Sequence, residues 1–170
     1  MRRICITGPE STGKTTLAQR LARSLNADWV PEAARVYAER VGRELTVHDV
    51  EPIAREHIAL ADAAAACAGQ VLVLDQDLIS TIVYGQAYYG CSSAWIESEA
   101  QSRLSDLYLL CDVDVAWTSD GVRDRPDGRH EMFAQFARAL EVRGAHVVVI
   151  RGDWETRSAA SLEAVRGLTS

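Results

Sequence analysis

Residues 8–15 have the sequence GPESTGKT, which fits the pattern G-x-x-x-x-G-K-[ST]. An apolar run at Arg3–Thr7 precedes this segment, and an amphipathic stretch that ends near Leu25 follows it. A strand, a glycine-rich loop and a helix in this order present several backbone N–H groups to a phosphate at the start of the helix. The pattern therefore predicts an α/β fold that binds a nucleotide through its phosphates.

Each part of the segment has an expected role. Gly8 and Gly13 let the backbone approach a phosphate without a Cβ in the way. Lys14, the only lysine among the 18 basic residues of the chain, is expected to bridge the β- and γ-phosphates, and the Thr15 hydroxyl is expected to bind Mg²⁺. The expected ATP-binding residues of this segment are Gly8, Pro9, Glu10, Ser11, Thr12, Gly13, Lys14, Thr15 and Thr16.

Short apolar runs alternate with helical patterns along the rest of the chain. This alternation predicts a five-stranded parallel sheet with helices on both faces, in one domain over residues 1–170. The expected strands are Arg3–Thr7, Asp28–Val30, Val71–Leu74, Leu107–Cys111 and His146–Ile150. The expected helices after the first are Glu32–Arg40, Val47–Cys67, Ile79–Tyr89, Ser93–Leu104, Glu131–Val142 and Glu155–Val165.

An acidic pair follows the apolar run Val71–Leu74. A phosphate-binding loop of this kind requires a carboxylate at the end of a neighbouring buried strand, where it holds the water shell of Mg²⁺. We expect Asp75 to bind Mg²⁺ through water, and Asp77, two residues later, to bind substrate hydroxyls.

The chain carries 18 basic and 24 acidic residues, a formal net charge of −6. It therefore lacks the positive field of a general nucleic-acid or anionic-membrane binder. No apolar run approaches the roughly 20 residues of a membrane span, and the four cysteines show no metal-ligand spacing. We expect a cytoplasmic protein that has neither nucleic acid nor membrane as a partner, while the oligomeric state is left open.

A polar segment at residues 118–129 holds three Arg, three Asp, two Gly and one Pro between an expected strand and an expected helix. Loops of this length in compact domains are more often functional than simple solvated connections. We interpret about residues 118–130 as a lid that excludes water from the transferred phosphoryl group. Arg123, Arg125 and Arg129 would then neutralise charge on the phosphoryl oxygens.

Some classes of phosphate-binding protein are excluded by what the chain lacks. GTPases that recognise guanine through Asn-Lys-x-Asp need a second lysine, which this chain does not have. AAA+ motors are longer and carry a further helical domain. A small kinase is the leading interpretation, and a regulatory module that binds or slowly hydrolyses ATP is the alternative.

Six segments over nearly the whole chain match one known pattern: GPESTGKTTLA (8–18), PEAARVY (31–37), LDQD (74–77), DLYLLCDVDVAW (106–117), DGVRDRPDGR (120–129) and VIRGDWETR (149–157). Together they resemble the ribosylnicotinamide (nicotinamide riboside) kinase domain of bacterial NadR-type proteins, within the P-loop kinases. The resemblance implies a three-layer P-loop kinase fold with an arginine-bearing lid. It also implies that ATP, with Mg²⁺ as cofactor, phosphorylates the 5′-hydroxyl of nicotinamide riboside to nicotinamide mononucleotide in NAD salvage.

The chain departs from the family pattern at two places near the expected acceptor pocket. The pattern has Asp-Thr-Asp where this chain has Asp75-Gln76-Asp77, and Pro-Trp where it has Ala116-Trp117. A kinase for another nucleoside therefore stays open as an alternative. NadR-type proteins commonly carry a nucleotidyltransferase domain ahead of the kinase, whereas this sequence begins at the first kinase strand, so we expect another protein to convert the mononucleotide to NAD.

Glu32 lies just after the weak strand, where related nucleoside kinases place an acidic group that faces the acceptor hydroxyl. We expect Glu32 to orient this hydroxyl and accept its proton, although a favourable charge at a helix N-terminus explains the residue equally well. Asp77 is the second candidate for the base. Arg35, one turn later, is expected to pair with Glu32 or to reach the substrate.

Nicotinamide is a flat cation, and such a group binds to aromatic faces and carboxylates. Tyr84 and Trp117 are the favoured aromatic residues because they lie close in sequence to the acidic pair and to the lid, and Tyr37 is a further candidate. Asp120 is expected to complement the ring charge or a sugar hydroxyl. The adenine of ATP is expected near the loop after the last strand, with the guanidinium of Arg157 stacked on the base.

Overall fold

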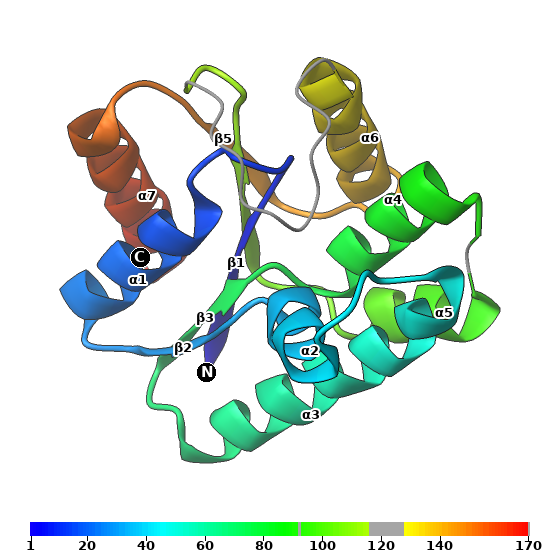
Figure 1. Cartoon of the computed structure of the whole chain (residues 1–170). Coiled ribbons are helices and arrows are strands. Elements are labelled where there is room, and N and C mark those ends of the chain that lie inside the picture. The colour runs from blue at the N-terminus through cyan, green and yellow to red at the C-terminus, as the bar shows by residue number, and fades with distance from the viewer. Residues whose placement is uncertain (92, 116–127, 170) are drawn as a thin grey trace.

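The computed structural model describes residues 1–91, 93–115 and 128–169, and its centre is a parallel sheet (Figure 1). The strands are β1 (Arg2–Thr7), β2 (Asp28–Val30), β3 (Val71–Asp75), β4 (Leu107–Cys111) and β5 (Val147–Ile150). They lie in the order β2-β3-β1-β4-β5, and every neighbouring pair is parallel. The predicted parallel sheet is confirmed, with strand ends within one residue of those expected.

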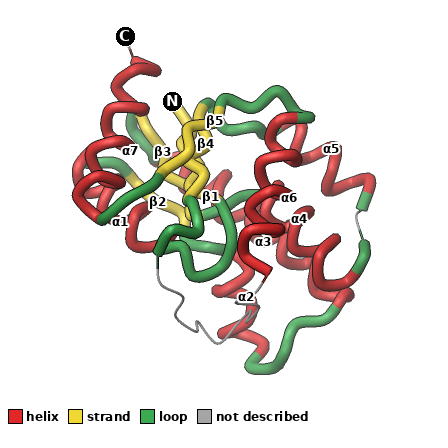
Figure 2. The backbone as a smooth tube through the Cα atoms, turned by 90° about the horizontal axis from the view of Figure 1, so that it is seen from above, coloured by secondary structure: helices red, strands yellow, loops and turns green. Residues whose placement is uncertain are grey.

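The helices connect the strands and cover the sheet. They are α1 (Lys14–Leu25), α2 (Ala33–Val41), α3 (Val50–Cys67), α4 (Leu78–Tyr89), α5 (Ala94–Ser102), α6 (Arg129–Glu141) and α7 (Trp154–Thr169), with a short 3₁₀ helix η1 (Val47–Asp49). Helices α1 and α7 cover one face of the sheet, and α3, α4 and α6 lie on the other (Figure 2). Among the described residues, no helix is both long enough and apolar enough to cross a membrane.

The burial pattern of β1 explains these three layers. Side chains alternate between the two faces of a strand, and both faces of this sheet are covered, so nearly every strand position is apolar. Ile4 and Ile6 are fully buried in the core that includes Leu17 and Leu21 of α1. Cys5, between them, is fully buried in the other core, among residues of α3, α4 and α6.

The register of the sheet brings the phosphate-binding loop and the acidic pair to the same edge. Ile6 of β1 lies opposite Asp75 of β3, and Thr7 lies opposite Leu110 of β4. The carboxyl ends of these three strands therefore meet. In open α/β sheets, ligands bind at this edge, where the chain leaves the strands to form loops.

Two helix boundaries differ from those expected for local reasons. The predicted helix Val47–Cys67 is divided, because the Thr46 N–H donates to the Asp49 carboxylate at 2.7 Å and the first turn is a separate 3₁₀ helix. Helix α7 continues beyond the predicted end at Val165. The remaining helices have the expected type and order.

Candidate active site

The glycines of the phosphate-binding loop are required by close approaches of other segments. Gly8 has φ 131°, and a Cβ built there would lie 2.7 Å from the carbonyl oxygen of Cys111. Gly13 has φ 81°, and its Cβ would lie 2.5 Å from the indole of Trp154. Both positions exclude a side chain sterically, and both backbone conformations favour glycine. The tight loop between β1 and α1 that the pattern predicts is confirmed.

Polar side chains of the loop hold it in its curved form. The Lys14 ammonium donates to the carbonyl of Pro9 at 2.5 Å, and the Thr12 hydroxyl donates to the same carbonyl at 2.8 Å. The Lys14 side chain is buried and therefore lies across the loop rather than in solvent. A phosphate bound in the loop would meet this ammonium together with backbone N–H groups at the start of α1.

Thr15 and Asp75 meet as the predicted metal site requires. The Thr15 hydroxyl donates to Asp75 Oδ2 at 2.6 Å. Burial raises the pKa of Asp75 to about 6, and the nearby charge of Glu32 adds to this effect. The other carboxylate oxygen, Oδ1, is buried without a hydrogen-bond partner among the described residues. An unpaired buried carboxylate oxygen beside a hydroxyl fits a hard cation with its water shell, such as Mg²⁺.

The described residues offer no cluster of three or more His, Cys, Asp or Glu side chains that could hold a metal ion. Mg²⁺ at Thr15 and Asp75 would therefore take its remaining oxygens from phosphates and water, which is how Mg²⁺ commonly binds with nucleotides.

A cavity of about 650 Å³ opens beside this end of the sheet, between α2, α3 and α4. Carboxylates dominate the charged residues that line it. Its one arginine, Arg43, binds the Asp49 carboxylate in a bidentate pair with distances of 2.7 and 2.8 Å. Burial lowers the pKa of His57 to about 4, so this side chain is neutral. The acidic lining residues are Glu32, Glu39, Glu44, Asp75 and Asp77.

Glu32 lies in this cavity at the start of α2, as the sequence analysis expected. Its carboxylate is mostly buried and lies 4.0 Å from Arg35 Nε, so the predicted pairing of these two residues is confirmed. The influence of Glu32 on the pKa of Asp75 places both negative charges near the same point. The structure therefore brings the proposed base next to the proposed metal ligand.

Asp77 also lines the cavity, but its oxygens already have protein partners. One oxygen accepts from the Ile79 N–H at 2.9 Å and thereby caps α4, and the other accepts from the Tyr108 hydroxyl at 2.6 Å. Burial raises the pKa of Asp77 despite these bonds. Of the two carboxylates considered for the base, the geometry favours Glu32, and Asp77 serves first as a cap.

Aromatic side chains of α4 form part of the cavity wall. Tyr84 donates to the Gly8 carbonyl at 3.2 Å and packs edge-on against Phe136, with 5.4 Å between ring centroids. Tyr88 also lines the cavity and donates to the Glu10 carboxylate at 3.3 Å. Tyr84 is thus where it was expected, whereas Tyr88 was not selected from the sequence. The signal for Tyr88 is its spacing of one helical turn from Tyr84.

Two predicted ligand contacts are wrong because the side chains point elsewhere. The Tyr37 hydroxyl donates to Asp49 at 3.0 Å and its ring lies under the guanidinium of Arg40, so it braces α2 instead of lining the cavity. The Glu10 carboxylate is buried and turned toward Tyr88 on α4. A carboxylate repels phosphate, so only the backbone of Glu10 is suited to bind ATP.

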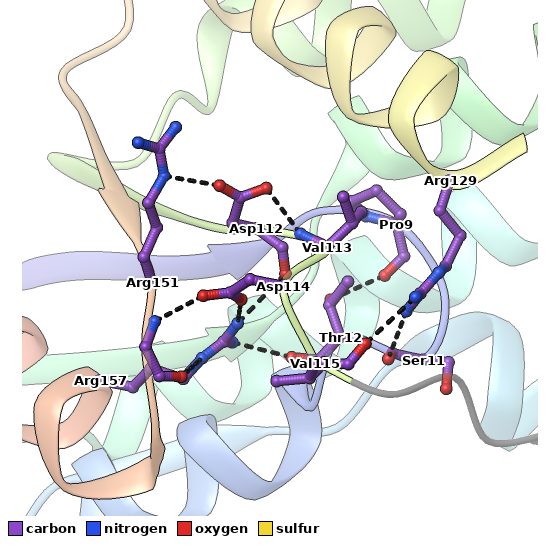
Figure 3. Close-up of polar contacts among 11 residues, drawn as sticks. Pro9, Ser11, Thr12, Asp112, Val113, Asp114, Val115, Arg129, Arg151 and Arg157 are labelled. Carbon is purple, nitrogen blue, oxygen red and sulfur yellow. Dashed lines mark hydrogen bonds and ion pairs between the residues drawn. The ribbon is translucent and has the colours of Figure 1, made fainter.

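The predicted stacking of Arg157 on adenine is also wrong. Arg157 is 0% exposed, and its guanidinium donates to the carbonyls of Gly152, Thr12 and Asp112 at 2.8, 3.0 and 3.2 Å and forms an ion pair with Asp114 (Figure 3). A guanidinium with this many protein partners has no face for a base. Arg157 instead ties α7 to the phosphate-binding loop.

Trp154, at the start of α7, occupies the exposed position near the loop. It is 36% exposed, its ring lies against Gly13, and the guanidinium of Arg20 is 5.2 Å from the ring centroid. The sequence analysis placed the adenine near this segment but selected the wrong residue. An aromatic residue at the start of a helix that follows the last strand is the signal that was available.

Arg129 is where the lid prediction placed it, beside the phosphate-binding loop. From the first turn of α6, its guanidinium donates to the Ser11 carbonyl at 3.3 Å and to the Val115 carbonyl at 3.1 Å (Figure 3). The other predicted lid and pocket residues lie outside the described residues; they are Trp117, Asp120, Arg123 and Arg125.

Comparisons with known proteins agree with this geometry. A family model described as an AAA domain matches residues 3–157, and a search of curated proteins gave no match. A solved structure of NadR protein in complex with nicotinamide riboside (NR) has a TM-score of 0.81 and 26% identity, and the match covers 99% of this chain and 51% of that chain. NadR protein in complex with NAD and AMP-PNP has a TM-score of 0.78 and 25% identity, with 99% and 49% covered.

Thymidylate kinase from Ehrlichia chaffeensis shares the fold, with a TM-score of 0.67 at 17% identity over 99% of this chain and 98% of that chain. This chain spans about half the length of the two NadR chains. The sequence analysis set AAA+ motors aside, and these solved neighbours carry the kinase fold under the AAA name. The chain belongs to the AAA-domain family, and over nearly its whole length its structure resembles the NadR-type P-loop kinase domain.

Proposed function

We propose that this protein transfers the γ-phosphoryl group of ATP to the 5′-hydroxyl of nicotinamide riboside, forming nicotinamide mononucleotide and ADP. The observation that carries the proposal is the charge of the acceptor cavity. Its acidic residues outnumber its one arginine, which is already paired with Asp49. Such a cavity repels an acceptor that already carries phosphate and attracts a cationic nucleoside.

This charge separates a nucleoside kinase from a nucleotide kinase on the same fold. A nucleoside monophosphate needs arginine or lysine side chains to bind its phosphate. In the described part of the cavity, no cation other than Arg43 is found. The resemblance to NadR protein in complex with nicotinamide riboside supports the same acceptor.

The residues of the chain supply position and charge. Backbone N–H groups of the loop and Lys14 would hold the phosphates of ATP in line with the acceptor. Glu32 would hold the 5′-hydroxyl and receive its proton as the oxygen bonds to the γ-phosphorus and ADP leaves. Mg²⁺, when bound at Thr15 and Asp75, would neutralise charge on the β- and γ-phosphates.

Other parts of the two substrates can be assigned from the described side chains. The hydroxyl-bearing rings of Tyr84 and Tyr88 line the cavity and offer faces or edges to a flat cationic ring. Trp154 offers an exposed aromatic surface beside the loop, and we assign the adenine to it in place of Arg157.

The lid completes the proposal. Arg129 already reaches the phosphate-binding loop from α6, and it would contact phosphoryl oxygens after a small rotation of its side chain. Arg123 and Arg125 are proposed to add positive charge there, and Trp117 and Asp120 to contact the acceptor. These four further roles follow from the resemblance and from the spacing within the segment.

The test is a panel of nucleosides and nucleoside monophosphates, each incubated with ATP, Mg²⁺ and the protein and analysed by mass spectrometry. We expect nicotinamide riboside to gain one phosphate with stoichiometric ADP, and thymidine monophosphate to remain unchanged. Phosphorylation of a different nucleoside would correct the acceptor. ADP formation without any phosphorylated acceptor would contradict the proposal and favour a regulatory ATPase.

A further inference from the structure

Gln76 is held in an unusual backbone conformation at the wall of the acceptor cavity. Its φ of 70° lies in the left-handed region, which residues with long side chains rarely adopt. Its N–H donates to the Ile6 carbonyl at 2.9 Å, and the next residue, Asp77, caps α4. Because the chain is fixed on both sides, the backbone determines where the Gln76 side chain points.

The polar end of this side chain is buried without being fully used. Gln76 is 4% exposed and lines the cavity, and its Oε1 atom has no hydrogen-bond partner among the described residues. Buried polar atoms in folded proteins are rarely left unpaired, so an exception at a cavity wall indicates contact with a bound molecule. A carboxamide can rotate by half a turn, so it offers either an acceptor oxygen or a donor N–H at this position.

Its neighbours on the same wall do not offer such an atom. The Ser80 hydroxyl shares a hydrogen bond of 3.1 Å with the Thr7 hydroxyl. Both carboxylate oxygens of Asp77 accept protein hydrogen bonds. On this part of the wall, Gln76 therefore has the polar group that is open to a ligand.

The position of Gln76 along the chain identifies the part of the acceptor that it meets. The preceding residue, Asp75, contacts the Thr15 hydroxyl of the phosphate-binding loop at 2.6 Å. The acceptor hydroxyl must come to this end of the cavity, and that hydroxyl is attached to the sugar. We propose that Gln76 is a specificity-determining residue that hydrogen bonds to a secondary hydroxyl of the sugar and so favours ribosides over deoxyribosides. This inference rests on the proposed nucleoside kinase function.

Two substitutions separate this contact from the fold. Gln76→Asn keeps the carboxamide and suits the left-handed backbone, because Asn adopts that region more readily than Gln, but its amide reaches one methylene less far. Gln76→Leu keeps the approximate size and removes the polar atoms. Gln86→Leu is the matched control, since Gln86 is an exposed residue of α4 that does not line the cavity.

The experiment measures kcat/KM for nicotinamide riboside and for its 2′-deoxy and 3′-deoxy analogues with each protein. We expect the wild type to lose about 3- to 10-fold with one of the analogues, as for a single neutral hydrogen bond. Gln76→Asn and Gln76→Leu should lose a similar factor with the riboside and nothing further with that analogue. The KM for ATP should not change, and Gln86→Leu should behave as the wild type.

An equal loss with the riboside and with both analogues would overturn the inference, because Gln76 would then act on something other than the sugar hydroxyls. An unchanged ratio between riboside and deoxyriboside in the variants would overturn it as well. If the wild type phosphorylates a different nucleoside of the panel, the proposed acceptor is wrong, and the same comparison on that nucleoside decides the role of Gln76. If it phosphorylates no nucleoside, the proposed function and this inference fall together.

Discussion

The two sides of the candidate active site differ in how their polar groups are satisfied. On the phosphate side, Lys14 and Thr12 donate to the Pro9 carbonyl, and Arg157 binds three carbonyls and a carboxylate. On the acceptor side, an oxygen of Asp75 and the amide oxygen of Gln76 are buried and have no described partner.

This difference indicates how the work of recognition is divided. The triphosphate has one shape and charge, so a loop that the protein already holds in position can bind it with little reorganisation. The acceptor is distinguished by a few hydroxyls and one ring, so the groups that recognise it must stay open. Substitutions on the phosphate side should therefore affect every reaction or the fold itself, whereas those on the acceptor side should depend on the acceptor.

The largest effect is expected for Lys14→Met. Removing the only ammonium in the loop leaves charge on the β- and γ-phosphates uncompensated, so kcat/KM should fall by about 1,000-fold or more with every acceptor. Steady-state kinetics measure this, and the circular dichroism spectrum should stay unchanged. Arg23→Met, an exposed residue of the same helix, is the control and should retain activity. Substantial activity in Lys14→Met would contradict the phosphate site.

The next effect concerns stability. Arg157→Leu leaves the Asp114 carboxylate and the carbonyls of Thr12 and Asp112 without their donor, and losing one partner of such a buried network costs about 3 kcal/mol. Urea unfolding should show a free energy of unfolding lower by this amount. Arg166→Leu, at an exposed position of α7, should change it little. A stable Arg157→Leu protein with a raised KM for ATP would restore the role in adenine binding.

A smaller effect is expected for Glu32→Gln, which keeps the shape but cannot accept the proton. The kcat for nicotinamide riboside should fall by about 100-fold, the lower range for general-base catalysis, with little change in the KM for ATP. The background ATPase rate should not fall in proportion, since that reaction needs no sugar hydroxyl. Glu141→Gln, on the exposed surface of α6, is the control. A loss confined to ATP binding would contradict this assignment.

The smallest effect is a pH dependence from His57 in the acceptor cavity. Burial lowers its pKa from 6.5 to about 4, and the charges of Arg103 and Arg3 contribute while Asp62 opposes them. Between these two pH values the unfolded chain binds a proton that the folded chain does not. The free energy of unfolding therefore falls as the pH is lowered through this window, by about 2 kcal/mol from His57.

Asp75 acts in the opposite sense, because its raised pKa of about 6 lets the folded chain keep a proton that the unfolded chain releases. The contribution of His57 must therefore be measured as a difference between the wild type and His57→Gln. Urea unfolding at pH 7.5 and 4.5 should show that the variant gains stability relative to the wild type at the lower pH. An equal difference at both values would show that His57 is not buried in its neutral form.

Much of the fold could be predicted from the sequence because its signals are local. The apolar runs, the loop pattern and the helical periods each lie within one element, so strand order apart, the architecture followed. The helix division at Asp49 was missed because a side chain to backbone hydrogen bond, and not the apolar period, ends the first turn. Lys14, Thr15 and Asp75 were assigned correctly because the first two lie in one loop and the third follows a strand that must neighbour it.

The roles of arginine and tyrosine side chains were harder to predict, because their direction depends on packing. Arg157 and Arg129 both lie near the phosphate-binding loop, but one is enclosed between α7 and the ends of β1 and β4 and the other extends from the first turn of α6. Tyr37 and Tyr84 are both helical residues, and only the latter faces the cavity. Residue type and spacing do not distinguish these cases.

The sequence by itself determined the phosphate-binding end of this protein, because two glycines, one lysine and one threonine within eight residues define a loop through local backbone geometry. Only the tertiary structure decided the acceptor end. There, Glu32, His57, Gln76 and Tyr84 come from separate elements, and the acidity of the cavity and the open amide of Gln76 exist only once α2, α3 and α4 pack around the end of β3. Burial and hydrogen-bond satisfaction are properties of the packed chain, and no local pattern encodes them.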